Sequence, residues 1–182
     1  VERDKILAGL SDEDRARIQR LEQKRDHILQ LCQENRSLPM DLLSEELAKV
    51  DQLSRSFVEL VVSARRFSDY LKLVQYNQLE QGLRRYESIS KNAEDAEQRQ
   101  LAQKNLDVLL RRKEKLTEIN HYVQKAYGQM ELIENTFRLL ADQIVTMRSP
   151  KELGSQLDDL LDGVEAVKST ARETDVLLQA EG

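Results

Sequence analysis

Apolar residues recur at alternating spacings of three and four residues along nearly the whole chain, and this repeat restricts the fold more than any other feature. No stretch alternates between apolar and polar residues in the way that a half-exposed strand does. The repeat is typical of helices that pack lengthwise against one another, because it places a continuous apolar seam on one face. The sequence therefore predicts an all-α fold built from long amphipathic helices.

Two strong seams occupy the middle of the chain. The downstream seam consists of Leu109, Leu116, Val123, Met130, Phe137 and Ile144, interleaved with Ile119, Ala126, Ile133, Leu140 and Met147. The upstream seam consists of Val50, Phe57, Ala64 and Leu71, interleaved with Leu53, Leu60, Phe67 and Val74. Gln78 and Gln81 then stand where apolar residues are due, and the stripe shifts to Leu79 and Leu83. Because glycine costs about 1 kcal/mol relative to alanine inside a helix, we expect a skip or soft point near Gly82.

Turn and capping residues divide the chain into four expected helices. Ser90, Asn92 and Asp95 favour a turn near residues 91–94. Pro39 ends a first helix, whereas Ser149 and Pro150 suit the N-cap and first position of a last helix. The expected helices span about residues 11–35, 41–90, 93–147 and 150–180.

The outer two helices also carry seams. The first has Ile18, Leu21, Ile28 and Cys32, and the last has Leu153, Leu157, Leu160, Val164, Val167, Ala171, Thr174 and Leu178. We expect one elongated domain over residues 1–182. In it, the two long central helices form an antiparallel hairpin, and the two shorter helices fold back from the end that carries Pro39 and Pro150.

Composition agrees with an extended helical body and indicates a reducing environment. Aromatic residues make up 4% of the chain and charged residues 34%. The single cysteine cannot form an internal disulfide, and no apolar run is long enough for a signal sequence or a membrane span. We therefore expect a cytoplasmic location. Because the chain begins with valine, we also expect it to be a piece of a longer protein, and a membrane tether in the rest of that protein is the alternative to a freely cytoplasmic location.

No constellation of reactive residues points to an enzyme. Glu118 and His121 have the spacing of half a di-iron site, but the only other histidine, His27, has Lys24 rather than glutamate three residues before it. Cys32 lies on an apolar stripe, where cysteine behaves as a small hydrophobe. Glycine-rich phosphate loops and zinc spacings are absent from the sequence. We predict neither catalysis nor a bound cofactor or metal.

The middle of the chain is mildly basic, although the net charge is -5. Residues 65–125 hold thirteen basic residues against nine acidic ones, whereas residues 149–182 hold three against eight. The candidates for contact with an anionic membrane are Arg84, Arg85, Arg111, Arg112, Lys113 and Lys115. Such a surface would be analogous to that of BAR-type modules, but no diagnostic motif of that family occurs. Interspersed glutamate and aspartate leave a second interpretation, a solvated helix flank. Binding of nucleic acid is disfavoured.

The same region has more apolar width than one partner helix can cover, since Val108, Leu109 and Leu110 are consecutive. A second copy of the chain would bury the excess, so the sequence predicts a homodimer. The predicted dimer contacts are Leu73, Tyr76, Leu79, Val108 and Leu110. The leading functional hypothesis is a non-enzymatic coiled-coil scaffold that mediates self-association and binds an unidentified protein partner. The alternative is a membrane-surface module that binds anionic lipid.

Overall fold

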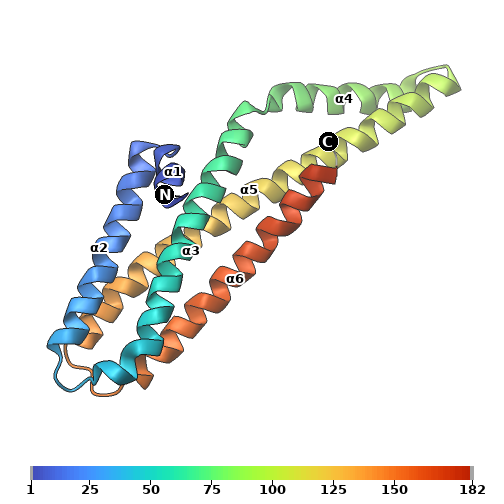
Figure 1. Cartoon of the computed structure of the whole chain (residues 1–182). Coiled ribbons are helices and arrows are strands. Elements are labelled where there is room, and N and C mark those ends of the chain that lie inside the picture. Colours follow the sequence, from blue (N-terminus) through green and yellow to red (C-terminus); the bar gives the residue numbers. More distant parts are fainter. Residues whose placement is uncertain (1, 181–182) are drawn as a thin grey trace. The chain divides into compact units, whose positions relative to one another are not determined.

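The computed structural model describes residues 2–180, with side chains from residue 2 to residue 173. Within these residues the chain is all-helical and contains no strand, which confirms the predicted fold class (Figure 1). The helices are α1 (Glu2–Ala8), α2 (Asp12–Glu34), α3 (Met40–Leu73), α4 (Tyr76–Asn92), α5 (Ala96–Ile144) and α6 (Lys151–Ala180).

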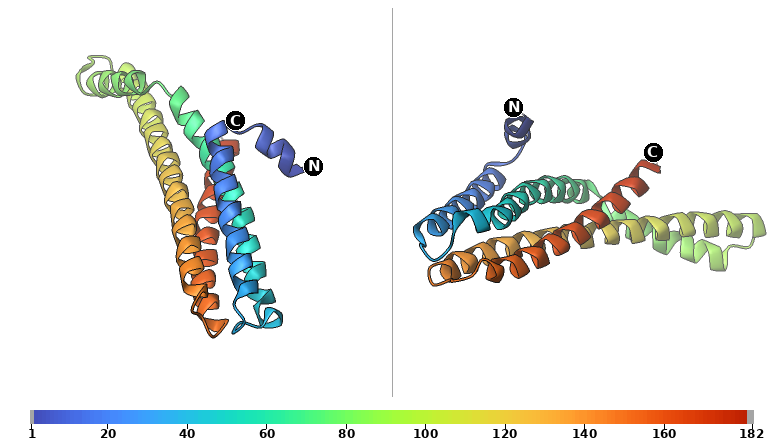
Figure 2. Two further views of the ribbon diagram at one scale, coloured as in Figure 1. Left: turned by 90° about the vertical axis from the view of Figure 1, so that its left-hand side faces the viewer. Right: turned by 60° about the horizontal axis from the view of Figure 1, so that its bottom comes forward.

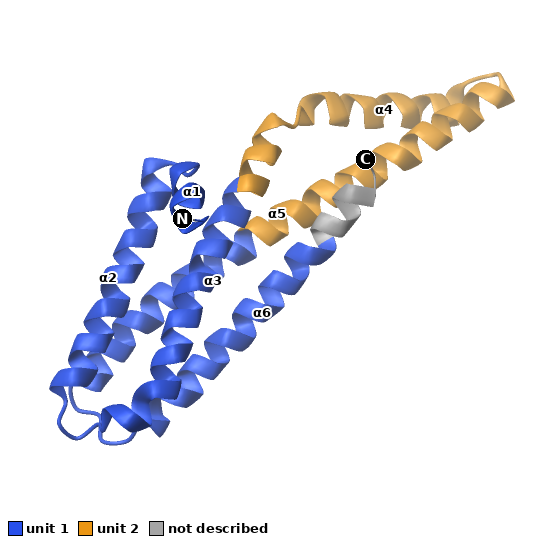
Figure 3. Ribbon diagram, in the orientation of Figure 1, with its two compact units in different colours: residues 1–65, 124–182 blue, residues 66–123 orange. Residues whose placement is uncertain are grey.

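The chain divides into two compact units, which are described separately (Figure 3). Unit 1 comprises Val1–Arg65 and Gln124–Gly182, and unit 2 comprises Arg66–Val123. Both α3 and α5 contribute residues to each unit. A single elongated domain and a central hairpin along the whole chain stay predictions.

Unit 1 is a bundle in which α2, α3, α5 and α6 are joined by polar contacts between neighbouring helices. These contacts are Asp14 with Arg65, Arg17 with Glu134, Lys49 with Asp158, and Gln143 with Gln156. The α2–α3 and α5–α6 pairs are each antiparallel (Figure 2). The α2 and α5 helices run parallel, as two contacts between them show. Arg17 near the start of α2 contacts Glu134, and Asn35 at the end of α2 contacts Ile144, which lies further along α5.

The predicted seams form the interior of unit 1, which confirms the expected core. From α5, Met130, Ile133, Phe137, Leu140 and Ile144 have no exposed surface. The other buried seam residues are Ile18, Leu21, Ile28, Cys32, Val50, Leu53, Phe57, Leu60, Ala64, Ala126, Met147, Leu153, Leu157, Leu160, Val164 and Val167. Ala171 is half-buried, and the side chains of Thr174 and Leu178 lie outside the described residues.

The two prolines stand immediately before helices, although Pro150 was predicted to be the first residue of the last helix and Pro39 to end the first one. Pro39 precedes α3, and Pro150 precedes α6. The first turn of α6 begins with backbone bonds from Glu152 to the carbonyl oxygen of Ser149 (3.3 Å) and from Leu153 to that of Pro150 (3.1 Å). Proline at these places removes no intrahelical hydrogen bond, and α3 and α6 each begin within one residue of the predicted start.

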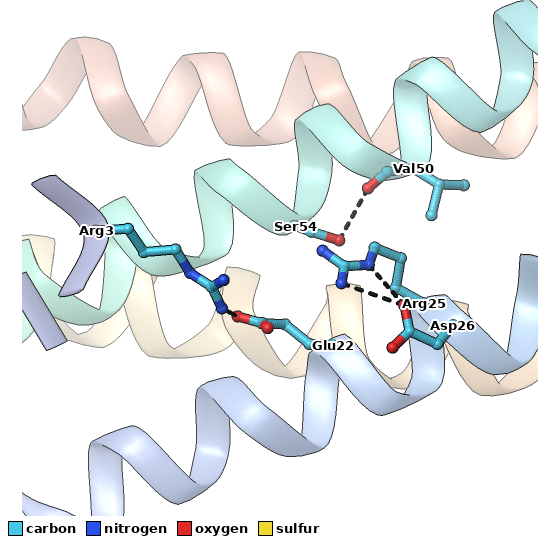
Figure 4. Close-up of polar contacts among 6 residues, drawn as sticks. All are labelled: Arg3, Glu22, Arg25, Asp26, Val50 and Ser54. Atoms are coloured by element: carbon cyan, nitrogen blue, oxygen red, sulfur yellow. Dashed lines mark hydrogen bonds and ion pairs between the residues drawn. The ribbon is translucent and has the colours of Figure 1, made fainter. Parts of the chain in front are cut away.

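A short helix, α1, precedes α2 and was not among the expected helices. Its Arg3 forms an ion pair with Glu22 of α2, as Figure 4 shows. The α2 helix then begins after Ser11, whose hydroxyl accepts a hydrogen bond from the backbone nitrogen of Asp14 at 3.2 Å. In the α3 segment of the same unit, the buried Ser54 hydroxyl donates to the carbonyl oxygen of Val50 at 3.0 Å.

In unit 2, the helix expected over residues 41–90 is interrupted at residues 74–75, which corrects the prediction. The soft point was expected near Gly82, but Gly82 lies inside α4. A β-carbon added at Gly82 would be 3.0 Å from Cδ1 of Leu109, so the glycine allows α4 to approach α5 closely. The break instead occurs at residues 74–75, where Gln75 has φ -91° and ψ 83°, and Leu79 and Leu83 beyond it pack into the core cluster.

The α4 and α5 helices of unit 2 are joined by a turn at residues 93–95, close to the predicted turn. Their core cluster consists of Leu79, Leu83 and Leu116, with Leu71, Val74, Leu106 and Leu109 packed around it. A second buried group contains Phe67 and Tyr122, whose rings meet edge to face with centroids 5.1 Å apart. Unit 2 therefore has a small core for its number of residues.

Candidate functional site

Four of the five predicted dimer contacts are exposed in unit 2. The exposed fractions are 81% for Leu73, 47% for Tyr76, 58% for Val108 and 49% for Leu110. The fifth, Leu79, differs from the prediction: it is only 3% exposed, because it packs into the core cluster against Leu83 and Leu116. It therefore holds unit 2 together rather than facing outward.

The sequence-based prediction missed another exposed apolar residue, Leu101. Leu101 is 56% exposed and lies seven residues before Val108, so both project from the same face of α5. Leu101 also lines a groove of about 520 Å³ between α4 and α5 near the turn, together with Tyr86, Ile89 and Ala102. The seven-residue spacing is visible in the sequence, but the seam prediction began only at Leu109. The groove extends the apolar surface of unit 2 toward the turn.

The six predicted contacts for an anionic surface fall into two groups. Lys113 forms an ion pair with Glu80 at 3.3 Å, and Lys115 forms one with Glu118 at 3.2 Å. The arginines Arg84, Arg85, Arg111 and Arg112 are exposed, and none forms an ion pair with a described residue. Of these, Arg85 lies over the ring of Tyr86, with its guanidinium carbon 5.7 Å from the centroid.

Histidine and cysteine do not form a reactive cluster in the described part of the chain. His121 is exposed, and Glu118 is paired with Lys115. Among residues 2–173, no group of three histidine, cysteine, aspartate or glutamate side chains is arranged to hold a metal ion. Cys32 has no exposed surface, and burial raises the pKa of its thiol. A neutral, enclosed thiol is a poor nucleophile.

Two of the cross-helix ion pairs of unit 1 are bidentate, and the sequence alone does not reveal them. Arg17 donates to both carboxylate oxygens of Glu134, at 2.6 and 3.3 Å, and its guanidinium carbon lies 5.9 Å from the ring centroids of Phe57 and Tyr127. Arg65 likewise donates to both oxygens of Asp14, at 2.8 and 3.0 Å. Seam periodicity predicts which faces are apolar, but it carries no information on which charges pair across helices.

No protein-family model, no curated protein and no solved structure matches this chain. None of the described helices carries an apolar stretch long enough to cross a lipid bilayer.

Proposed function

We propose that this chain is a non-enzymatic helical scaffold that associates with a second copy of itself through the exposed apolar surface of unit 2. In this proposal the helices act as coiled-coil elements, with the two long central segments forming an antiparallel hairpin in the assembled protein. An unidentified protein partner would bind the bundle of unit 1. The association step is the part that the residues of unit 2 support most directly.

One observation carries the proposal: α4 buries very little. Of its 17 residues, only Leu79 and Leu83 are buried. Across the hairpin, Leu101, Val108 and Leu110 of α5 remain about half exposed. A helix draws most of its stability from the burial of an apolar face against other elements. A second copy of the hairpin would supply the missing surface, as in four-helix assemblies made from two hairpins.

Sedimentation equilibrium at micromolar concentration tests the association. The wild-type chain is expected to be dimeric, and the double substitution Leu101→Glu/Val108→Glu is expected to be monomeric, because these side chains share one face of α5 and a dimer would have to bury two carboxylates. The matched control is Leu132→Glu/Leu139→Glu, which places the same charges at exposed positions of α5 in unit 1. A monomeric wild type would contradict the proposal. Dissociation by the control alone would contradict the assignment to unit 2.

The second candidate function is binding to an anionic membrane surface. The observation that favours it is the set of four exposed arginines, Arg84, Arg85, Arg111 and Arg112, without a carboxylate partner among the described residues. Each basic residue near an anionic bilayer contributes about 1 kcal/mol to binding. The interspersed carboxylates and the net charge of -5 weaken this candidate.

Vesicle co-sedimentation decides between the two functions. A membrane module should bind vesicles containing phosphatidylserine but not vesicles of phosphatidylcholine alone, and added salt should weaken the binding. The double substitution Arg111→Gln/Arg112→Gln should reduce binding to the vesicles that contain phosphatidylserine. If the wild type stays in the supernatant with both kinds of vesicle, the membrane function is wrong, while self-association is unaffected.

A further inference from the structure

A groove of about 610 Å³ in unit 1 is lined mainly by charged side chains of α2, α3 and α5. Its basic residues are Arg17, Arg20, Lys24, Arg65 and Arg138. Its acidic residues are Glu13, Asp14, Glu131 and Glu134. The proposed self-association uses unit 2 and gives this groove no role.

Two of the five basic residues are already neutralised within the protein. Arg17 makes two bonds to Glu134, and Arg65 makes two bonds to Asp14. Paired bonds of this kind fix a guanidinium firmly on its carboxylate. These four residues therefore form the walls of the groove, and their charges are largely satisfied.

The other three basic residues, Arg20, Lys24 and Arg138, form no ion pair with any described residue. Arg20 and Lys24 are four residues apart and so share a face of α2, whereas Arg138 comes from α5. Arg138 reaches only the side-chain oxygen of Asn135, at 3.5 Å. Three cations thus converge on one groove without a dedicated counter-charge.

The electrostatics of Lys24 show that these cations act on one another. Burial lowers the pKa of the Lys24 ammonium, and the positive charges of Arg138, Arg20 and Arg17 lower it further. Glu134 opposes them but does not cancel the effect. A folded protein that holds three cations together is destabilised by their repulsion, and a bound anion would relieve it.

We propose that this groove binds a compact phosphate group, either free or as a phosphate monoester, held by Arg20, Lys24 and Arg138. A phosphate monoester carries about -1.5 to -2 charges near neutral pH and offers three strong acceptor oxygens. Its charge and its acceptors suit three converging donors better than a single carboxylate would.

The acidic residues of the groove favour a small ligand over an extended anionic surface. Glu13 and Glu131 line the same groove and form no ion pair among the described residues. A bilayer or a nucleic acid would bring many charges against these carboxylates, whereas one phosphate reaches the cations with little repulsion from them. The carboxylates thus restrict the size of the anion that the groove accepts.

The test is a titration of isotopically labelled protein followed by backbone amide NMR shifts, at constant ionic strength. Inorganic phosphate and O-phosphoserine are the two probes, and the one that binds more tightly identifies a free phosphate or an ester as the ligand. Saturable shifts in residues of α2 and α5 that line the groove are expected. The variant Lys24→Gln/Arg138→Gln should bind about tenfold more weakly or worse, since it loses two charged donors.

The matched control is Arg55→Gln/Arg148→Gln, which removes the same charge from exposed positions of unit 1 outside the groove and should leave phosphate binding unchanged. Arg20→Gln is a milder second variant, because Arg20 is exposed and contributes little to packing. Linear shifts that do not saturate, or equal affinity in the groove and control variants, would overturn the proposal. Binding to phosphatidylserine vesicles through these residues without binding of either soluble probe would also overturn it.

Discussion

The side chain of Asn35, directly after α2, closes the end of α5 by donating to the carbonyl oxygens of Ile144 at 2.6 Å and Met147 at 3.1 Å. Its amide oxygen also accepts a bond from the backbone nitrogen of Ser37 at 2.9 Å. Ile144 is the last residue of α5, and its carbonyl oxygen also accepts a bond from the backbone nitrogen of Met147 at 3.3 Å. The Asn35 amide therefore gives this helix-end carbonyl a second donor and supplies a donor to the carbonyl of Met147 in the following loop. One residue thereby shapes its own turn and fixes the parallel register of α2 and α5.

Replacing Asn35 should therefore destabilise unit 1 more than replacing an ordinary loop residue would. We expect Asn35→Ala to reduce the free energy of unfolding by about 1–3 kcal/mol, because it removes the donor to the Met147 carbonyl and one of the two donors to the Ile144 carbonyl. Asn35→Asp should be worse, since it sets a negative charge against the negative end of a helix. Urea denaturation followed by circular dichroism measures both. The control is Asn105→Ala, because the Asn105 amide donates only to the carbonyl oxygen of Leu101 in its own helix. If neither Asn35 substitution lowers the free energy of unfolding more than Asn105→Ala does, the role given to Asn35 is wrong.

The ion pair of Asp14 with Arg65 should give unit 1 an acid-sensitive contribution to stability. The hydrogen bonds from Arg65 hold the pKa of the Asp14 carboxyl below its ordinary value of 3.8, and they outweigh the effect of burial, which raises it. A lowered folded-state pKa means that the stabilisation is complete well above pH 3.8 and is lost as the pH falls through the folded-state pKa. Asp14→Asn should cost about 1–3 kcal/mol at neutral pH.

The difference in unfolding free energy between wild type and Asp14→Asn should shrink as the pH falls below about 3.8. Asp12 is the matched control, since it lies in the same first turn and pairs with Arg15, but its side chain is 96% exposed. Asp12→Asn should change stability by no more than about 1 kcal/mol. A constant difference between Asp14→Asn and wild type from neutral pH down to strongly acidic pH would contradict the assignment.

The glycines of α4 and α5 should respond differently to alanine. Gly128 has open space around it, with no atom within 4 Å of an added β-carbon, and no glycine in the described residues has a positive φ. Gly128→Ala should therefore stabilise the protein by about 0.5–1 kcal/mol through helix propensity. Gly82→Ala should gain less or lose stability, because its β-carbon would meet Leu109 at 3.0 Å. Thermal unfolding of the two variants distinguishes them, and an equal gain would show that the α4–α5 contact is loose.

The apolar core was predictable from the sequence because it depends on a local periodic pattern. Phe137 and Ile144 are seven residues apart on α5, and both are fully buried. The position of the helix break was not predictable in this way. Residues 74–75 contain neither glycine nor proline, so no local helix-breaking residue marks the break, whereas the packing of Leu79 and Leu83 against Leu116 is a contact with another helix.

The charged groove of unit 1 could not be predicted from the sequence pattern either, because it depends on packing between helices. Arg20 and Lys24 are visible as basic residues on one face of α2, but that pattern is also typical of a solvated helix face. Their convergence with Arg138 requires the parallel packing of α2 on α5. Likewise, the exposure of Leu101 and Val108 depends on how far α4 covers α5.

The most direct test of the proposed scaffold is a measurement of distances between copies by double electron–electron resonance. A nitroxide attached to Val108→Cys reports only intermolecular distances, because each chain then carries one label; the native Cys32 is fully buried and is not expected to react. The account predicts a narrow distribution of short distances at residue 108, and longer or broader distances for a label at Leu139→Cys in unit 1. A labelled chain that sediments as a dimer but shows neither dipolar modulation nor spectral line broadening at residue 108 would contradict self-association through unit 2.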